Sequence, residues 1–306
     1  MSDSDDLIDE LRRIAAGYGA APAEVVPTRP DVVIVRAGEV VVKAHAPGSE
    51  KAPLAGRMRA VGHPALRGIM LEPVTEEVRV VGDRLVTVWP AGTPVDHTAP
   101  DAAPWEAAAR LLAGLHAVPA RTLPPLPEAG GPARVTAMVA RLRSGSAAER
   151  VVRRALACLP MPVPGAGAGA DTGRGSTTHG DWHMGQLVRI RGEWILIDVD
   201  DLGIGDPAWD LARPAAWFAA GLLAPDVWHR FLGAYRAAGG FAAGANGDPW
   251  ERLDLPAQAM TVQLTAAAVA NAEREERPLD DVEQVLVDTC QRIVQFRSAC
   301  HSVPTQ

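Results

Sequence analysis

Three polar side chains in one stretch of the chain have the types and spacing that phosphoryl transfer requires. The stretch is HGDWHMGQLVRIRGEWILIDVDDLGIGDPAWDLARP, residues 179–214. In it, Asp181 lies five residues before Gln186 and seventeen before Asp198. Phosphoryl transfer needs a carboxylate that takes the proton of the acceptor hydroxyl, and oxygen ligands that hold Mg²⁺ on the phosphates. The stretch contains all of these groups, in the order that an ATP-dependent phosphotransferase uses.

The segment between these polar residues predicts how they meet. Residues 187–190 and 194–197 are apolar runs joined by Arg191-Gly192-Glu193, a pattern typical of a β-hairpin. A hairpin turns the chain back on itself. Asp198 is therefore expected to return to the loop that holds Asp181.

Composition and charge narrow the class of protein. The 306 residues suggest two domains, and a hydrophobic content of 47% is sufficient for real cores. A formal charge of −7 argues against a nucleic-acid partner. No apolar run has the length of a membrane span and the first residues are acidic, so a cytoplasmic protein without a membrane anchor is expected. Three cysteines without a CxxC pair predict neither a zinc site nor a disulfide framework.

The order of the predicted elements divides the chain in two. An amphipathic helix is expected at residues 4–17, followed by two β-hairpins at 32–44 and 77–89. A segment rich in Pro and Gly follows, and a helix with one apolar face is expected at 105–117. Pro-rich and Gly-rich segments at 119–132 and 160–178 are predicted to be surface loops.

The few lysines of the chain provide a second indication of a phosphate-binding residue. The chain has only two lysines, Lys43 and Lys51, and Lys43 lies in the strand-like run VVVKAH. A compact ammonium group in a strand is suited to a nucleotide phosphate. A strand lysine that faces solvent is the alternative interpretation of this segment.

Residues 179–212 resemble the catalytic core of the aminoglycoside phosphotransferase and choline kinase-like family. The matching motifs are His179-Gly180-Asp181 through Gln186, then Ile197-Asp198, then the GDPAWDLA run at 205–212. RLLAGLHAVP at 110–119 and VVVK at 40–43 also resemble segments of the family. The resemblance implies an α+β, bilobal protein-kinase-like fold. Its small β-rich N-terminal lobe is expected at residues 1–92, and its larger, mainly helical C-terminal lobe at 93–306.

The resemblance also implies roles for individual residues. Asp181 is the expected catalytic base, Gln186 and Asp198 are the expected Mg²⁺ ligands, and Lys43 is the expected phosphate contact. The hinge between the lobes is expected at residues 88–90, where the backbone of Val88 and Trp89 would bind the adenine. The implied nucleotide is ATP, with GTP as an alternative. His179, Asp206 and Asp210 are expected to brace the loop rather than to react.

Three departures from the family pattern stand out. Gln186 replaces the usual Asn, and the HGDxHxGQ loop resembles that of maltokinases. The run RAGEV offers one glycine where a Gly-rich phosphate loop is expected. The family's lysine pairs with a helix glutamate, yet Glu50 is the only acidic residue between Ala44 and Leu71. The partner of Lys43 therefore stays open.

The resemblance implies that the acceptor is a small molecule with a hydroxyl group, and the class of this acceptor has two interpretations. Resemblance to resistance phosphotransferases favours a cationic antibiotic of the aminoglycoside or basic peptide type, whereas Gln186 favours a sugar or amino sugar. Trp182 and Asp200 are candidate acceptor contacts; Asp200 could instead bind a second metal or lie in a solvated turn. The acidic run NAEREERPLDDVEQ could hold a cationic acceptor or form a solvated helix face.

Two interpretations belong to other classes of protein. His179, Asp181 and His183 have the spacing of a metal-dependent hydrolase site, although few histidines follow. A nucleotide-binding pseudoenzyme is the other alternative, motivated by Gln186 and the glycine-poor hairpin.

Overall fold

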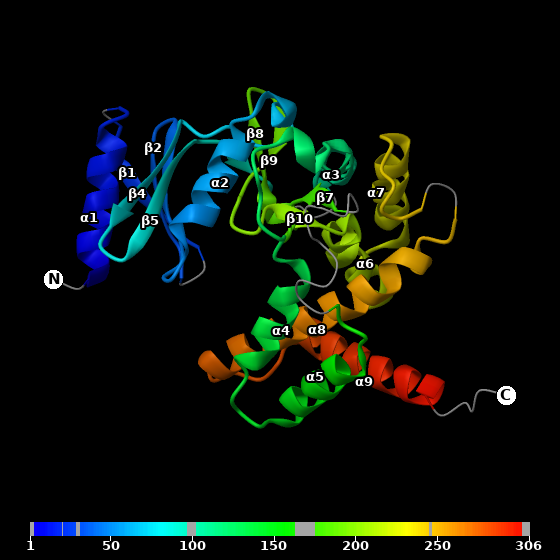
Figure 1. Cartoon of the computed structure of the whole chain (residues 1–306). Helices are drawn as coiled ribbons and strands as arrows, with labels where there is room; N and C mark the ends of the chain where they lie inside the picture. Colours follow the sequence, from blue (N-terminus) through cyan, green and yellow to red (C-terminus); the bar gives the residue numbers. More distant parts are fainter. Residues whose placement is uncertain are drawn as a thin grey trace.

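The computed structural model describes residues 3–19, 21–28, 31–96, 102–162, 175–244 and 247–301. An antiparallel sheet with one covering helix forms one end of the molecule, and most of the helices form the other end (Figure 1). This arrangement confirms the predicted α+β architecture with a β-rich N-terminal lobe and a helical C-terminal lobe. None of the helices within the described ranges is both long and apolar enough to span a membrane.

The Lys43 side chain lies on the face of the N-terminal sheet that is directed towards the C-terminal lobe. Its strand order is β1-β2-β3-β5-β4. Successive side chains of a strand point to opposite faces of the sheet. Val42 and Val88 pack against helix α1 (Asp3–Ala16) on one face, so Lys43 and Trp89 lie on the opposite face. The strands are β1 (Ala23–Val26), β2 (Val33–Ala37), β3 (Val40–Ala44), β4 (Thr75–Val81) and β5 (Arg84–Pro90), which confirms both predicted hairpins.

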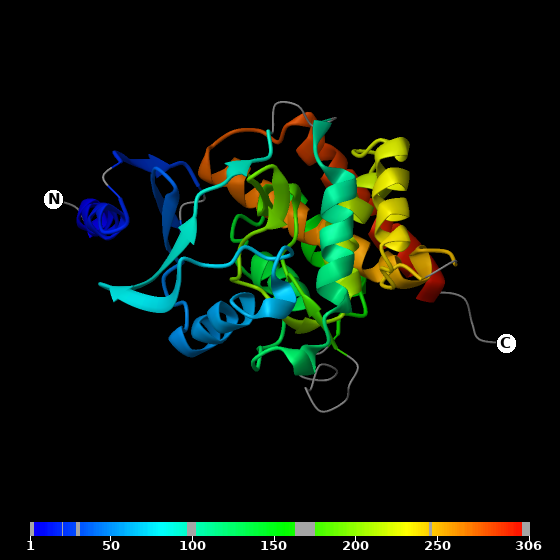
Figure 2. The same ribbon diagram turned by 90° about the horizontal axis from the view of Figure 1, so that it is seen from above.

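Helix α2 (Lys51–Val61) lies between this sheet and the C-terminal lobe, as Figure 2 shows from above. Its Leu54 and Met58 belong to a hydrophobic core that continues into the C-terminal lobe. Arg57 on the same helix donates from Nε to the carbonyl oxygen of Leu202 over 2.8 Å. This core continues across the predicted boundary between the two lobes, at residues 92 and 93. That boundary therefore stays a prediction.

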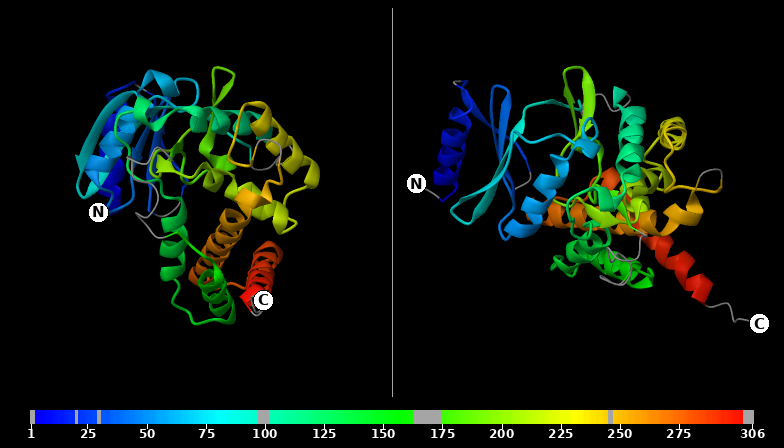
Figure 3. Two further views of the ribbon diagram at one scale, coloured as in Figure 1. Left: turned by 45° about the vertical axis from the view of Figure 1, so that its right-hand side comes forward. Right: turned by 45° about the horizontal axis from the view of Figure 1, so that its top comes forward.

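The helices of the C-terminal lobe form two groups. Helix α3 (Trp105–Ala117), at the predicted position, packs on α7 (Pro225–Ala237). A second group has its own hydrophobic core and is seen together in Figure 3. It consists of α4 (Gly131–Ala140), α5 (Ala147–Cys158), α8 (Trp250–Arg274) and α9 (Asp281–His301), and α6 (Ala212–Ala219) packs on α8. Of the two predicted loops, 119–132 contains a short 3₁₀ helix (Ala120–Thr122), and most of 160–178 lies outside the described residues.

Two strand pairs hold the motif stretch. Strand β7 (Ser176–Thr178) precedes the Asp181 loop and pairs with β10 (Gly203–Gly205), which follows the Asp198 loop. Between them, β8 (Leu187–Ile190) and β9 (Glu193–Leu196) form the predicted hairpin, and β6 (Thr93–Pro94) pairs with β8. Arg191 and Gly192 at its turn have φ of 51° and 92°, as a two-residue hairpin turn requires. Both loops therefore lie at the same end of these pairs, which confirms that Asp198 returns towards Asp181.

We expect Gly203→Ala to destabilise the protein by about 1–3 kcal/mol, the usual cost of overpacking. A Cβ at Gly203 would lie 2.6 Å from both the Ala129 nitrogen and the Pro127 oxygen, which are backbone atoms. Gly233→Ala is the matched control, because a Cβ there meets nothing within 4 Å on helix α7. The control should gain about 0.5–1 kcal/mol in a helix interior. Urea unfolding of both variants tests this, and equal stabilities would contradict it.

Candidate active site

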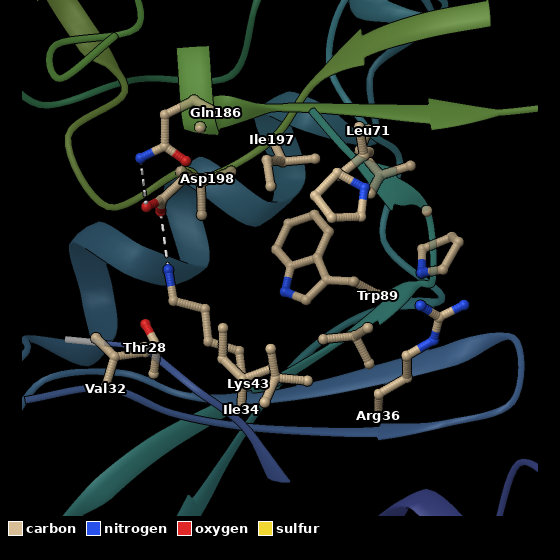
Figure 4. Close-up of a pocket in the computed structure, with 18 of the residues that line it drawn as sticks. Thr28, Val32, Ile34, Arg36, Lys43, Leu71, Trp89, Gln186, Ile197 and Asp198 are labelled. Carbon is tan, nitrogen blue, oxygen red and sulfur yellow. Dashed lines mark hydrogen bonds and ion pairs between the residues drawn. The ribbon is translucent and has the colours of Figure 1, made fainter. Parts of the chain in front are cut away.

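A cavity of about 480 Å³ lies between the sheet and the β8–β9 hairpin. Figure 4 shows Lys43, Gln186 and Asp198 at one side of it, and Leu71, Trp89 and Ile197 at the other. Aliphatic side chains supply much of the remaining wall, namely Val26, Val32, Ile34, Val41 and Val188. The cavity thus has an apolar part and a polar part, and its volume is in the range of small-molecule sites.

Lys43 forms two ion pairs at the polar end of the cavity. Its Nζ lies 2.8 Å from Asp198 Oδ1 and 2.9 Å from Asp200 Oδ2. Burial alone lowers the pKa of Lys43, but the two carboxylates outweigh burial and raise it. For the carboxylate of Asp198, burial alone raises the pKa, but the ammonium group of Lys43 brings this pKa well below the ordinary value. The alternative of a strand lysine that faces solvent is therefore wrong. The partners of Lys43 are Asp198 and Asp200.

Asp200 is a structural partner of the lysine rather than a free carboxylate. Its Oδ2 pairs with Lys43, and its Oδ1 lies 2.6 Å from Nδ1 of the buried His45. Burial and the charge of Asp198 raise the pKa of Asp200, but Lys43 and His45 reverse the shift, so the pKa is lowered. Both oxygens are engaged within the protein, which leaves the predicted acceptor contact without support from this placement.

Gln186 and Asp198 could together hold a metal ion. Gln186 donates from Nε2 to Asp198 Oδ2 over 3.1 Å, so its Oε1 is the atom available as a ligand. Asp198 has φ of 72°, a conformation that non-glycine residues seldom adopt. A carboxylate and an amide oxygen fit Mg²⁺, which binds one or two carboxylates together with substrate phosphates. Within the described ranges, no cluster of three or more His, Cys, Asp or Glu side chains could hold a metal ion.

Asp181 is flanked by two arginines that the sequence analysis did not identify. Arg134 Nη2 lies 2.6 Å from its Oδ2, and Arg213 Nη2 lies 3.3 Å from its Oδ1. Arg134 on α4 also pairs with Asp201. Burial lowers the pKa of the Arg213 guanidinium. Arg213 directly follows the GDPAWDLA motif, so its position was a usable signal, whereas nothing in the sequence near Arg134 indicated its role.

Asp210 anchors the backbone of the Asp181 loop. Its carboxylate accepts hydrogen bonds from the backbone nitrogens of His179 and Gly180, at 2.7 and 2.8 Å. His116 Nε2 lies 3.0 Å from the same carboxylate. The ring of His179 donates from Nε2 to the carbonyl oxygen of Ile197 over 2.8 Å. His179 and Asp210 thus occupy bracing positions, as predicted.

Asp206 lies at the start of the segment that contains Asp210. Its Oδ1 accepts a hydrogen bond from the Ala208 nitrogen over 3.0 Å, at the N-terminus of the 3₁₀ helix Pro207–Leu211. Arg252 Nη2 also lies 2.9 Å from this oxygen. Asp206 therefore caps this short helix, which is a structural position, as expected from the sequence.

The sequence profile described as the phosphotransferase enzyme family matches residues 28–255. The chain belongs to the phosphotransferase enzyme family. The matched span includes Lys43, the motif stretch and most of the cavity lining. Membership indicates an enzyme that phosphorylates a hydroxyl group of a small molecule. No curated protein sequence matches this phosphotransferase significantly.

Several solved structures share the fold of this phosphotransferase at low identity. The choline kinase LicA from Streptococcus pneumoniae has a TM-score of 0.59 and 16% identity, over 97% of this chain and 100% of that chain. Aminoglycoside phosphotransferase APH(3″)-Id from Streptomyces rimosus has a TM-score of 0.56 and 20% identity, over 84% and 98%. A thermostable mutant of aminoglycoside phosphotransferase APH(4)-Ia, in ternary complex with AMP-PNP and hygromycin B, has a TM-score of 0.57 and 12% identity, over 94% and 98%.

Two predicted hinge residues take different places in the phosphotransferase. Trp89 lines the cavity, and its predicted backbone contact with adenine stays a prediction. The Val88 side chain is fully buried on the α1 face, and its carbonyl oxygen accepts a hydrogen bond from the Val74 nitrogen over 3.0 Å. The backbone of Val88 is therefore used by the sheet. The cavity lining continues through Pro90, which lies within the predicted hinge, and through Gly92.

The Trp182 ring packs in the core of the C-terminal lobe. Its side chain is buried and stacks on Phe231, with ring centroids 5.5 Å apart, and Trp105 contacts it edge-on. Trp228 is buried in the same cluster. Both tryptophans therefore serve core packing. The predicted acceptor contact of Trp182 has no counterpart in this placement.

The residues of the hydrolase alternative are engaged in other contacts. Asp181 pairs with two arginines, and His179 Nε2 donates to a backbone carbonyl. His183 accepts a hydrogen bond at Nδ1 from the Gly185 nitrogen over 3.1 Å. Burial and the nearby charge of Arg213 lower the pKa of His183 to about 4, so its ring is neutral at pH 7. These contacts do not form a shared metal site.

We expect Asp210→Asn to lower the free energy of unfolding by about 3–5 kcal/mol at neutral pH, as when a buried charged partner is removed. Burial raises the pKa of Asp210, but His116 and backbone hydrogen bonds lower it below the ordinary value. The stability that it contributes is thus present above about pH 4 and is lost as the pH falls further. Urea unfolding should show the gap between wild type and variant narrowing in acid. A gap that is constant with pH would contradict this assignment.

Proposed function

We propose that this phosphotransferase moves the γ-phosphate of Mg·ATP to a hydroxyl group of a small molecule. The observation that carries the proposal is the meeting of Lys43, Asp198 and Gln186 at the polar end of one cavity, with contacts of 2.8 and 3.1 Å. Phosphoryl transfer depends mainly on such positioning and charge neutralisation. Solved structures with the same fold include complexes with AMP and with AMP-PNP.

Each group of the site has a defined task in this proposal. The apolar walls and Trp89 bind the adenine, and Lys43 neutralises charge on the phosphates. Gln186 and Asp198 would hold Mg²⁺, which neutralises the charge that develops on the phosphate oxygens. Asp181 accepts the proton of the acceptor hydroxyl. Arg134 and Arg213 contact both oxygens of its carboxylate and hold it in one orientation.

Our leading acceptor is an antibiotic of the aminoglycoside or basic peptide type. The GDPAWDLA motif supports it, and the similar APH(4)-Ia structure holds hygromycin B. The acidic run at residues 271–284 gives this acceptor limited support. Arg277 pairs with both Glu275 and Glu283 of that run, so part of its negative charge is already neutralised.

A neutral sugar is the second candidate acceptor, and a specific observation favours it. The described side chains that contact the Asp181 carboxylate are two guanidinium groups, Arg134 and Arg213. Guanidinium groups can donate hydrogen bonds to sugar hydroxyls, whereas the ammonium groups of a cationic acceptor are donors only and cannot accept them. Gln186 supports the same candidate, because the loop that contains it resembles the maltokinase loop.

We expect Asp181→Asn to reduce kcat by about 10²- to 10⁴-fold, the usual contribution of a positioned general base. Binding of Mg·AMP-PNP should remain close to that of the wild type, because Asp181 acts on the acceptor. Steady-state kinetics together with calorimetry measure both quantities. Asp198→Ala is the contrasting variant and should abolish Mg²⁺-dependent nucleotide binding. Near-full activity of Asp181→Asn would remove this residue from its role.

A panel of acceptors tests the two candidate classes directly. Purified protein with Mg·ATP should release ADP and add a phosphate, detected by mass spectrometry, to an aminoglycoside or basic peptide antibiotic. Turnover on maltose or another neutral sugar alone would instead establish the second candidate. Choline and glucosamine complete the panel. Nucleotide binding without turnover of any acceptor would contradict both candidates and favour the pseudoenzyme alternative.

A further inference from the structure

The lysine at the polar end of the cavity lacks the usual helix glutamate as its partner. In the protein-kinase-like fold that this chain resembles, a helix glutamate holds the nucleotide lysine. Helix α2 (Lys51–Val61), the helix that follows the Lys43 strand, has the sequence KAPLAGRMRAV and contains no acidic residue. Lys43 instead pairs with Asp198 and Asp200, both from the loop after β9.

The two carboxylates differ in what else they touch. Asp198 also contacts Gln186 and belongs to the candidate metal pair, so a bound metal competes with Lys43 for it. Asp200 is held from behind by His45, whose side chain is only 1% exposed. His45 lies two residues after Lys43, so both side chains face the same side of the sheet. Asp200 is therefore the partner that can stay with Lys43 when Asp198 turns to a metal.

A chain of hydrogen bonds continues from His45 to the cavity wall. His45 Nε2 lies 2.8 Å from Thr87 Oγ1, and Trp89 Nε1 donates to the same oxygen over 2.8 Å. Indole nitrogen is only a donor, so the Thr87 hydroxyl accepts from Trp89 and donates its own hydrogen bond to His45 Nε2. His45 then donates from Nδ1 to Asp200. Every member of this buried chain is satisfied in that arrangement, which is the condition for a rigid polar network.

We propose that Asp200 and His45 together form the positioning device for Lys43 in place of the helix glutamate. The same chain, through Thr87, also fixes the indole of Trp89 in the cavity wall. Asp200, His45 and Thr87 are thus positioning residues, and they act on the nucleotide through Lys43 and Trp89. This inference rests on the proposed function, because it assumes that the cavity binds Mg·ATP.

Two substitutions of His45 separate its contacts. His45→Asn keeps a side-chain nitrogen near the position of Nδ1 and can still donate to Asp200. His45→Gln reaches the position of Nε2 and keeps the contact with Thr87, but it loses Asp200. We expect His45→Gln and Asp200→Asn to weaken Mg·AMP-PNP binding about 10-fold or more, the scale of a lost hydrogen bond to a charged group. His45→Asn should stay within about 3-fold of wild type, a shift of less than 1 kcal/mol.

Calorimetric titration with Mg·AMP-PNP is the measurement, and urea unfolding of each variant reports folding separately. Asp83→Asn, which removes an exposed carboxylate on the β4–β5 turn, is the charge-matched control and should bind like wild type. In a Lys43→Met background, His45→Gln should have no further effect, because its action passes through the lysine. A purely structural role of His45 would instead weaken binding equally in both backgrounds.

The outcomes distinguish this inference from the proposed function. If wild type itself fails to bind Mg·AMP-PNP, the proposed function fails. If wild type binds and Lys43→Met binds weakly, but Asp200→Asn and His45→Gln bind like wild type, only the positioning device is overturned. Tighter binding by Asp200→Asn would also overturn it, since Asp200 would then compete with the phosphates for Lys43.

Discussion

The ion pairs of Lys43 with Asp198 and Asp200 are the interaction on which the rest of the site depends. They join the central strand of the N-terminal sheet to the loop after β9, over 155 and 157 residues of sequence. The side chains are only 11%, 15% and 22% exposed, so each charge needs the others to offset its loss of hydration. The cavity therefore has its polar end where these two parts of the chain meet, and its apolar walls follow from the strands on either side.

The loops that supply these groups are held from behind by buried polar contacts. Asp210 accepts two backbone hydrogen bonds from the His179-Gly180 segment, and the His179 ring binds the carbonyl oxygen of Ile197. The first contact places Asp181, and the second ties its loop to the residue before Asp198. Gly180 has φ of 83° and packs against Asp201, so only glycine suits this position. Rigid support of this kind is what positioning catalysis requires.

Local patterns in the sequence predicted the elements well, because hairpins and amphipathic helices are set by neighbouring residues. The hairpins at 32–44 and 77–89 and the helix at 105–117 are confirmed. Contacts between distant segments were not predictable in the same way. No local signal linked Arg134 to Asp181, or His45 to Asp200, because tertiary packing alone brings them together. Trp182 was a candidate acceptor contact because it follows Asp181 in the motif, but its burial places it in the core.

The central claim is that Mg·nucleotide replaces Asp198 as a partner of Lys43 while Asp200 stays in place. A crystal structure of the protein with Mg·AMP-PNP tests this most directly. We predict that Asp198 and Gln186 contact the metal, that Lys43 contacts a phosphate, and that Asp200 remains between Lys43 and His45. A metal held without Asp198, or Asp200 displaced from Lys43 in the complex, would contradict this claim.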